Sequence, residues 1–152
     1  MFKGTSAITL DSKNRITMPT RYREELLADC QGQLVCTVDI QNPCLALYPI
    51  DEWEEIEIKL AGLSSMQPAN KMLQQVILGH ATECQMDKAG RLLLSGPLRE
   101  YANLSKNVRL VGSLKKFEIW QEDAWLAHIQ QGISKIQSGE IELTEQALEL
   151  SL

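Results

Sequence analysis

The chain has 152 residues, which is enough for one ordinary domain or two very small ones. Hydrophobic residues make up 44% and charged residues 23%, values typical of a soluble globular protein and not of a disordered one. No apolar run approaches the roughly 20 residues that span a bilayer, and the N-terminus lacks the features of a secretory signal. We therefore expect a cytoplasmic protein with no membrane partner.

Charge is unevenly distributed along this acidic chain, whose formal net charge is −5. Residues 1–23 contain five basic residues and one Asp, a local charge of +4, whereas residues 137–152 contain four Glu and no base. A local field decides what one edge of a protein attracts. The total charge disfavours a generic nucleic-acid binder, but the basic N-terminal edge leaves DNA open as a partner.

The predicted elements begin with two short strands, over 6–10 and 15–18, on either side of the polar segment DSKN. A short helix over 21–28 follows, with Thr20 as its expected N-cap, and then two apolar strands over 33–39 and 44–48.

Helical spacing dominates the next segment and returns near the C-terminus. Asp51 is expected to cap a helix whose apolar face comprises Trp53, Ile56, Leu60 and Leu63. A helix from about Pro68 to His80 is expected to bury Met72, Leu73, Val76 and Ile77. A last helical face comprises Trp125, Ile129, Ile133 and Ile136. For the acidic end, residues 140–152, the sequence is compatible with either a helix or a frayed tail.

The chain contains an internal repeat. DSKNRITM at 11–18 aligns with DKAGRLLL at 87–94, and LALY at 45–48 aligns with FEIW at 117–120. Each copy predicts a strand, a D-x-x-x-R turn, a strand, a short helix, a strand pair and a helix. A copy of about 45 residues is too small to bury a stable core alone, so we expect both copies to share one core. The repeated aromatic residues are expected in the core or at a subunit interface: Tyr48, Trp53, Trp120 and Trp125.

The two D-x-x-x-R turns predict their own geometry. Asn14 and Gly90 occupy the fourth position of each motif, and these residue types readily take a positive φ. Asp11 and Asp87 are expected to shape the turns by accepting backbone N–H bonds and by pairing with the Arg four residues later.

Other kinds of site are poorly supported. The four cysteines are irregularly spaced, as expected of reduced, buried thiols. His80 and Cys84 could share a helical face as zinc ligands, but a second close ligand pair is missing, so we expect no metal. The two histidines lie in no nucleophile motif and there is no phosphate loop. We expect no enzyme, no cofactor and no small-molecule substrate.

The start MFKG, the stretch LDSKNR-x-x-x-P-x-R-Y-R, the stretch GHA-x-ECQMD-x-x-GR and the doubled turn resemble the MraZ family over essentially the whole chain. The resemblance implies an α+β fold built as a tandem AbrB-like swapped-hairpin β-barrel, two pseudo-twofold-related β-hairpin units with flanking α-helices. The expected division is a first DNA-binding unit over 5–52, connecting helices over 53–80, a second unit over 81–124, and a C-terminal helix with an acidic tail over 125–152.

The resemblance also implies a function. The family regulates transcription, and we expect this chain to repress its own division and cell-wall gene cluster as a nucleoid-associated ring oligomer on direct repeats in promoter DNA. Matched to the motif, Lys13 and Arg15 in the first turn and Lys88 and Arg91 in the second face double-stranded DNA. Three further basic residues are weaker candidates for DNA contact: Lys3, Arg21 and Arg23. For Arg21 and Arg23, an ion pair with a neighbouring Glu or another chain is an equal alternative. The competing hypothesis is an AbrB-like protein-interaction module, either antitoxin-like or a ring scaffold.

Overall fold

The computed structural model describes all of residues 1–152, and the α+β class predicted from the sequence is confirmed. Its strands are β1 (Thr5–Thr9), β2 (Arg15–Thr17), β3 (Gln33–Val38), β4 (Leu45–Pro49), β5 (Thr82–Gln85), β6 (Arg91–Leu93), β7 (Asn107–Ser113) and β8 (Lys116–Gln121). Its helices are α1 (Thr20–Cys30), α2 (Ile50–Ala61), α3 (Pro68–His80), α4 (Gly96–Tyr101), α5 (Glu122–Gln137) and α6 (Glu145–Leu148).

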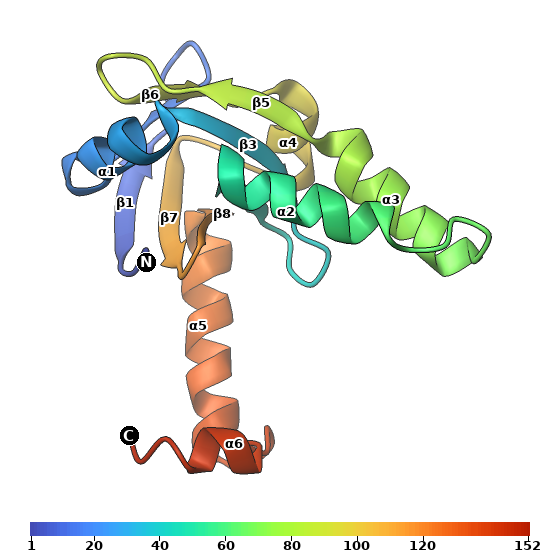
Figure 1. Ribbon diagram of the computed structural model, residues 1–152. Coiled ribbons are helices and arrows are strands. Elements are labelled where there is room, and N and C mark those ends of the chain that lie inside the picture. The colour runs from blue at the N-terminus through green and yellow to red at the C-terminus, as the bar shows by residue number, and fades with distance from the viewer. The chain divides into compact units, whose positions relative to one another are not determined.

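The strands form one large sheet and one small ribbon (Figure 1). The six-stranded sheet has the order β1-β7-β8-β4-β3-β5, and β2 pairs with β6 in a separate two-stranded ribbon. All these pairings are antiparallel. They describe an open sheet with β1 and β5 at its edges, and no closed barrel.

Strands of the two repeats are interleaved, although β3–β4 and β7–β8 also pair within their own repeats. Each strand of the first repeat pairs with one of the second: β1 with β7, β2 with β6, β3 with β5, and β4 with β8. Neither repeat therefore completes a sheet by itself, which agrees with the expectation of one shared core.

The ribbon is fixed to the molecule by the side chains of its inner face. Ile16 and Leu92 lie opposite each other in the β2–β6 register and are fully buried. Met18 and Leu94, which follow the two strands, are buried as well. Leu93 points the other way and is 61% exposed. This period-2 alternation holds the ribbon, and the turns that precede its strands, in place.

The helix starts differ from those predicted. Neither Thr20 nor Asp51 is an N-cap, because α1 begins at Thr20 and α2 at Ile50. The residues before them, Pro19 and Pro49, have extended backbone with ψ of 143° and 148° and take the cap position without a side-chain bond.

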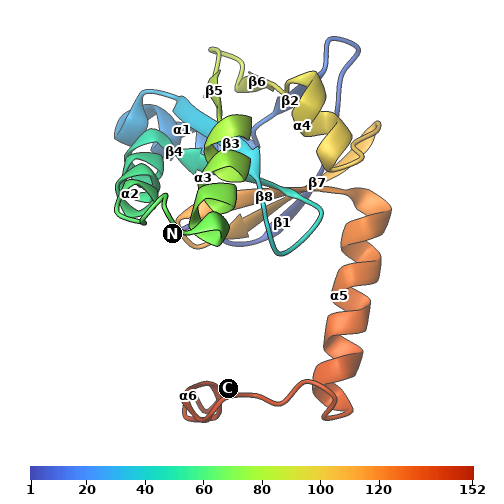
Figure 2. The same cartoon turned by 90° about the vertical axis from the view of Figure 1, so that its right-hand side faces the viewer.

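Helices α2 and α3 pack on the sheet beside β3 and β4 (Figure 2). Of the predicted α2 face, Trp53 and Leu60 are buried, whereas Leu63 is exposed. The predicted burial of α3 is wrong for Met72, which is 60% exposed, and no α3 side chain is fully buried. One side of α3 contacts the sheet, where Thr37 donates a 2.7 Å hydrogen bond to the carbonyl of Ile77.

Residues 1–122 form one compact unit and residues 123–152 a second. The helical face predicted near the C-terminus is confirmed by α5, none of whose side chains is buried. The acidic end contains one short helix, α6, capped by the Thr144 hydroxyl. None of the helices has the length and apolar content needed to cross a bilayer.

Candidate nucleic-acid interface

The first D-x-x-x-R turn, residues 11–15, forms a compact tip held by one carboxylate. Asp11 Oδ1 accepts backbone N–H bonds from Lys13 at 2.8 Å and from Arg15 at 2.9 Å. Asp11 Oδ2 accepts a 3.0 Å bond from Arg15 Nε. Asn14 has a φ of 63°, as predicted. Asp11 thus both shapes the turn and orients the side chain of Arg15.

The second tip, residues 87–91, repeats this geometry. Asp87 Oδ1 accepts the backbone N–H of Ala89 at 2.9 Å and of Arg91 at 2.8 Å, and its Oδ2 accepts Arg91 Nε at 2.8 Å. Gly90 has a φ of 81°, as predicted. Asp11 and Asp87 thus make the same set of backbone and arginine contacts in the two tips.

These contacts keep both carboxylates charged. The backbone N–H bond from Arg15, followed by its side-chain bond, lowers the pKa of Asp11 against an opposing effect of desolvation. The same bonds from Arg91 lower the pKa of Asp87. Each tip therefore has a charged carboxylate at neutral pH, 3.0 Å from Arg15 Nε in the first tip and 2.8 Å from Arg91 Nε in the second.

Of its side-chain nitrogens, each tip arginine uses only Nε in holding the turn. The Nη groups of Arg15 and Arg91 make no hydrogen bond within the protein, and the two side chains are 26% and 41% exposed. Lys13 and Lys88 are exposed beside them. An oriented guanidinium with free Nη groups can bind a phosphate, or guanine O6 and N7 as a pair.

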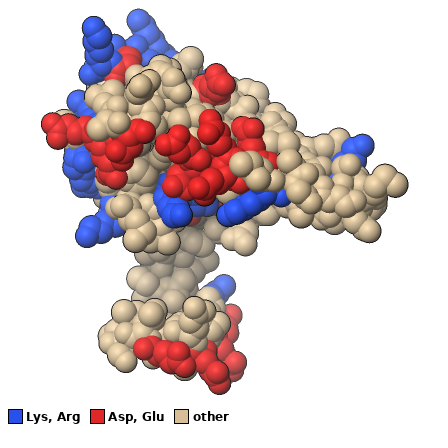
Figure 3. All heavy atoms as spheres, viewed as in Figure 1, with Lys and Arg blue, Asp and Glu red and all other residues tan.

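Both tips lie on the same side of the unit formed by residues 1–122. The loops before β2 and β6 are separate but point to the same side in Figures 1 and 2, and Lys and Arg side chains stand out on that side in Figure 3. The β2–β6 ribbon joins them: Leu94 N–H bonds to the Asn14 carbonyl at 3.0 Å, and Met18 N–H bonds to the Gly90 carbonyl at 2.7 Å. At about 3.4 Å per strand residue, Gly90 lies about 14 Å from Leu94 and from the first tip.

The structure places two other predicted residues, Lys3 and Arg21, away from the tips. Arg21 bonds to the Ser6 hydroxyl at 2.7 Å and stacks over Tyr22, whose hydroxyl donates to the Lys3 carbonyl. Lys3 and Arg21 thus lie near the start of β1, at the opposite end of that strand from the first tip.

Arg23, the remaining predicted residue, lies beside the second tip although it belongs to the first repeat. Two further basic residues near the tips were missed. Arg99 occupies the place in α4 that Arg23 has in α1, and the aligned pairs Arg23-Glu24 and Arg99-Glu100 were the available signal. Lys106 is exposed, and its carbonyl accepts the N–H of Leu10 at the base of the first tip, a contact with no signal in the sequence.

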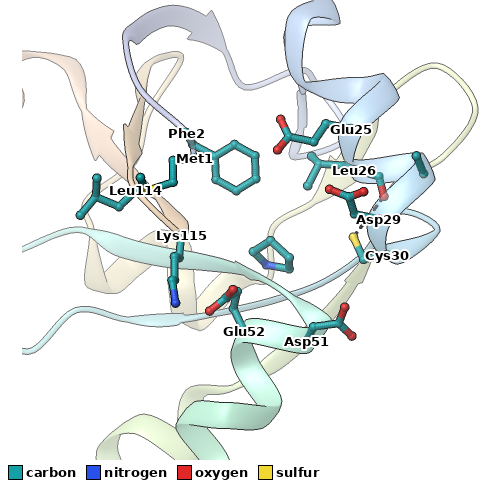
Figure 4. Close-up of a pocket in the computed structure, with 12 residues that line it drawn as sticks. Met1, Phe2, Glu25, Leu26, Asp29, Cys30, Asp51, Glu52, Leu114 and Lys115 are labelled. Carbon is teal, nitrogen blue, oxygen red and sulfur yellow. Dashed lines mark hydrogen bonds between the residues drawn. The ribbon is translucent and has the colours of Figure 1, made fainter.

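A hollow of about 640 Å³ lies between α1, the start of α2 and the N-terminal residues (Figure 4). Glu25, Asp29, Asp51 and Glu52 line it, with Lys115 as the one basic side chain. This acidic lining repels phosphate, so the hollow is unsuited to a nucleic acid.

The cysteines are free and buried, as predicted. Burial raises the pKa of the Cys84 thiol to about 11. Burial also raises the pKa values of the thiols of Cys30, Cys36 and Cys44. No three metal-ligating side chains gather in one place.

Comparison with known proteins agrees with this arrangement. The family described as "MraZ protein, putative antitoxin-like" matches the chain twice, over residues 1–76 and 77–146. The chain is 72% identical to a protein of Colwellia psychrerythraea, 57% identical to one of Pseudoalteromonas atlantica and 53% identical to one of Yersinia pseudotuberculosis. Each match covers all 152 residues of this chain and all of the relative, and each relative is named transcriptional regulator MraZ. The chain therefore belongs to the MraZ family.

Proposed function

We propose that this protein is a DNA-binding transcription regulator that contacts DNA through its two D-x-x-x-R tips. The observation that carries the proposal is the pair of carboxylate-oriented arginines, Arg15 and Arg91, one at each end of the antiparallel β2–β6 ribbon. The names of this chain's relatives, transcriptional regulator MraZ, support the regulatory role. The arrangement resembles the AbrB-type swapped hairpin, with units over 5–52 and 81–124 flanked by helices over 53–80 and 125–152.

The spacing of the tips indicates how much DNA one chain covers. Successive major-groove turns on one face of DNA are about 34 Å apart, whereas the tips are separated by about 14 Å. Both tips of one chain therefore serve one short site, with arginine in the major groove and Lys13 or Lys88 on neighbouring phosphates.

One short site per chain gives weak binding, and this favours an assembly. A ring that places several tip pairs along one rim engages several direct repeats together, which raises affinity by about 10² to 10⁴ without new contacts per chain. Such a ring also explains how a chain of net charge −5 binds DNA, because only the basic tips approach the phosphates. The expected target is the promoter of its own division and cell-wall gene cluster, repressed in the cytoplasm at the nucleoid.

Retention of the DNA immediately upstream of its own gene tests the tips. Arg15→Ala should weaken binding at least about fivefold and Arg15→Ala with Arg91→Ala more strongly, because each oriented arginine contributes about 1–3 kcal/mol. Lys71→Ala, which removes one exposed charge on α3, is the matched control and should bind normally. Full affinity in the double variant would show that the tips are not the DNA site.

The number of repeats tests the assembly. Binding to fragments with one repeat and with several should differ by about 10²-fold or more, and the affinity should fall steeply with salt. Equal affinity for both fragments would exclude the ring model while leaving the tips as the DNA site.

A protein partner is the second candidate function. The apolar face of α5 has no buried side chain, and the family description includes the term antitoxin-like. If wild-type protein fails to retain the upstream DNA at any salt concentration, this interaction-module function replaces the first.

A further inference from the structure

An arginine stands behind each tip at equivalent positions of the two repeats. Arg23 of α1 donates its Nε–H to the Met18 carbonyl at 2.7 Å, and Arg99 of α4 donates its Nε–H to the Leu94 carbonyl at 3.1 Å. Both side chains are half-buried. The two bonds fix the residues that end the β2–β6 ribbon.

Those same ribbon residues hold the tip of the other repeat. Met18, from the first repeat, donates its N–H to the carbonyl of Gly90 in the second tip at 2.7 Å. Leu94, from the second repeat, donates its N–H to the carbonyl of Asn14 in the first tip at 3.0 Å. The chain of contacts therefore crosses between repeats on both sides.

Arg23 also contacts the second tip directly. A Cβ built on Gly90 would lie 2.4 Å from Arg23 Nε and 2.8 Å from Arg23 Cδ, so the arginine occupies the space of a side chain at position 90. The positive φ alone does not demand glycine, because Asn14 takes a φ of 63° in the first tip. The close approach of Arg23 explains why the second tip has Gly where the first has Asn.

We propose that Arg23 is a positioning residue for the second tip and Arg99 for the first, so that each tip is built from both repeats. Their importance for DNA rests on the proposed function, but the bracing itself is a property of the free protein. Substitution of Arg23 should destabilise the second tip, and substitution of Arg99 should destabilise the first tip.

Amide hydrogen exchange of the full-length protein, measured without DNA, tests the crossing. Arg23→Ala should speed exchange at Ala89 and Arg91 roughly tenfold and leave Lys13 and Arg15 unchanged, since a bond to a charged donor is lost on one side only.

Arg99→Ala should give the reverse pattern, with faster exchange at Lys13 and Arg15. Arg21→Ala, on the same helix as Arg23 but bonded to Ser6, is the matched control and should change neither tip. Faster exchange in the tip of the mutated residue's own repeat, or equally in both, would overturn the proposal.

The conservative variant Arg23→Lys separates positioning from charge. Lysine keeps the charge but lacks the Nε–H that reaches Met18, so the second tip should exchange as fast as in Arg23→Ala. Full protection in Arg23→Lys would show that charge suffices and that the guanidinium contact does not position the tip.

A double-mutant cycle at the contact gives a second test. Gly90→Asn should lower the melting temperature in the wild-type background and much less in Arg23→Ala, because removing the arginine frees the space for the new side chain. Equal shifts in both backgrounds would mean that Arg23 does not press on Gly90. Because no step uses DNA, failure here leaves the proposed function standing, and failure of DNA binding leaves this inference standing.

Discussion

At the scale of single residues, each tip depends on an aspartate that accepts three hydrogen bonds. Two of these come from backbone N–H groups and one from the arginine side chain. Bonds to the charged form favour it, so the folded pKa of Asp11 and Asp87 lies below the unfolded value. The stability that this adds is present above about pH 4 and is lost as the pH falls through the folded pKa.

The order of these causes gives a prediction for Arg15→Ala. This variant removes the side-chain bond but keeps the backbone N–H bond, which is the larger cause of the lowered pKa of Asp11. An NMR titration of the carboxyl carbons should find the pKa of Asp11 raised but still below 3.8 in the variant, with Asp87 unchanged. A full return to 3.8 would show that the side chain, and not the backbone, holds the carboxylate.

At the scale of elements, the tips were predictable because their geometry is local. A D-x-x-x-R motif with Asn14 or Gly90 at its fourth position specifies a turn within five residues. The pairing of β1 with β7 and of β3 with β5 was not predictable, because strand partners are chosen by non-local packing. For the same reason the sequence did not show that Arg23, a residue of the first repeat, lies beside the second tip.

The ribbon is the element that carries both tips, and its inner face should dominate stability. Leu92→Ala should cost about 2–5 kcal/mol in the free energy of unfolding, since the side chain is fully buried and leaves a cavity. Leu93→Ala, one residue away and 61% exposed, should cost less than about 0.5 kcal/mol. Denaturant unfolding of both variants measures the difference. Similar costs would mean that the ribbon does not anchor the tips to the core.

At the scale of the whole molecule, the C-terminal unit presents an apolar seam. The side chains of Leu126, Ile129, Ile133 and Ile136 are between 38% and 51% exposed. Their spacing of three, four and three residues is the heptad spacing by which helices pair. A continuous exposed apolar stripe indicates an interaction surface. This observation supports the proposed self-association, which the tips alone do not explain.

The seam gives a prediction that links assembly to DNA. Ile133→Glu places a charge within the seam and should shift the protein to a smaller species in light scattering coupled to size exclusion. Gln131→Glu adds the same charge on the opposite side of α5, since two residues turn a helix by about 200°, and should leave the assembly unchanged.

The same pair of variants separates the affinity gained from assembly from the affinity gained from direct tip–DNA contact. Ile133→Glu should bind a single-repeat fragment as the wild type does, because the tips are intact, and should lose most of the gain on a fragment with several repeats. Loss of single-repeat binding would instead place α5 at the DNA. An unchanged species in light scattering would show that the α5 seam does not join the chains.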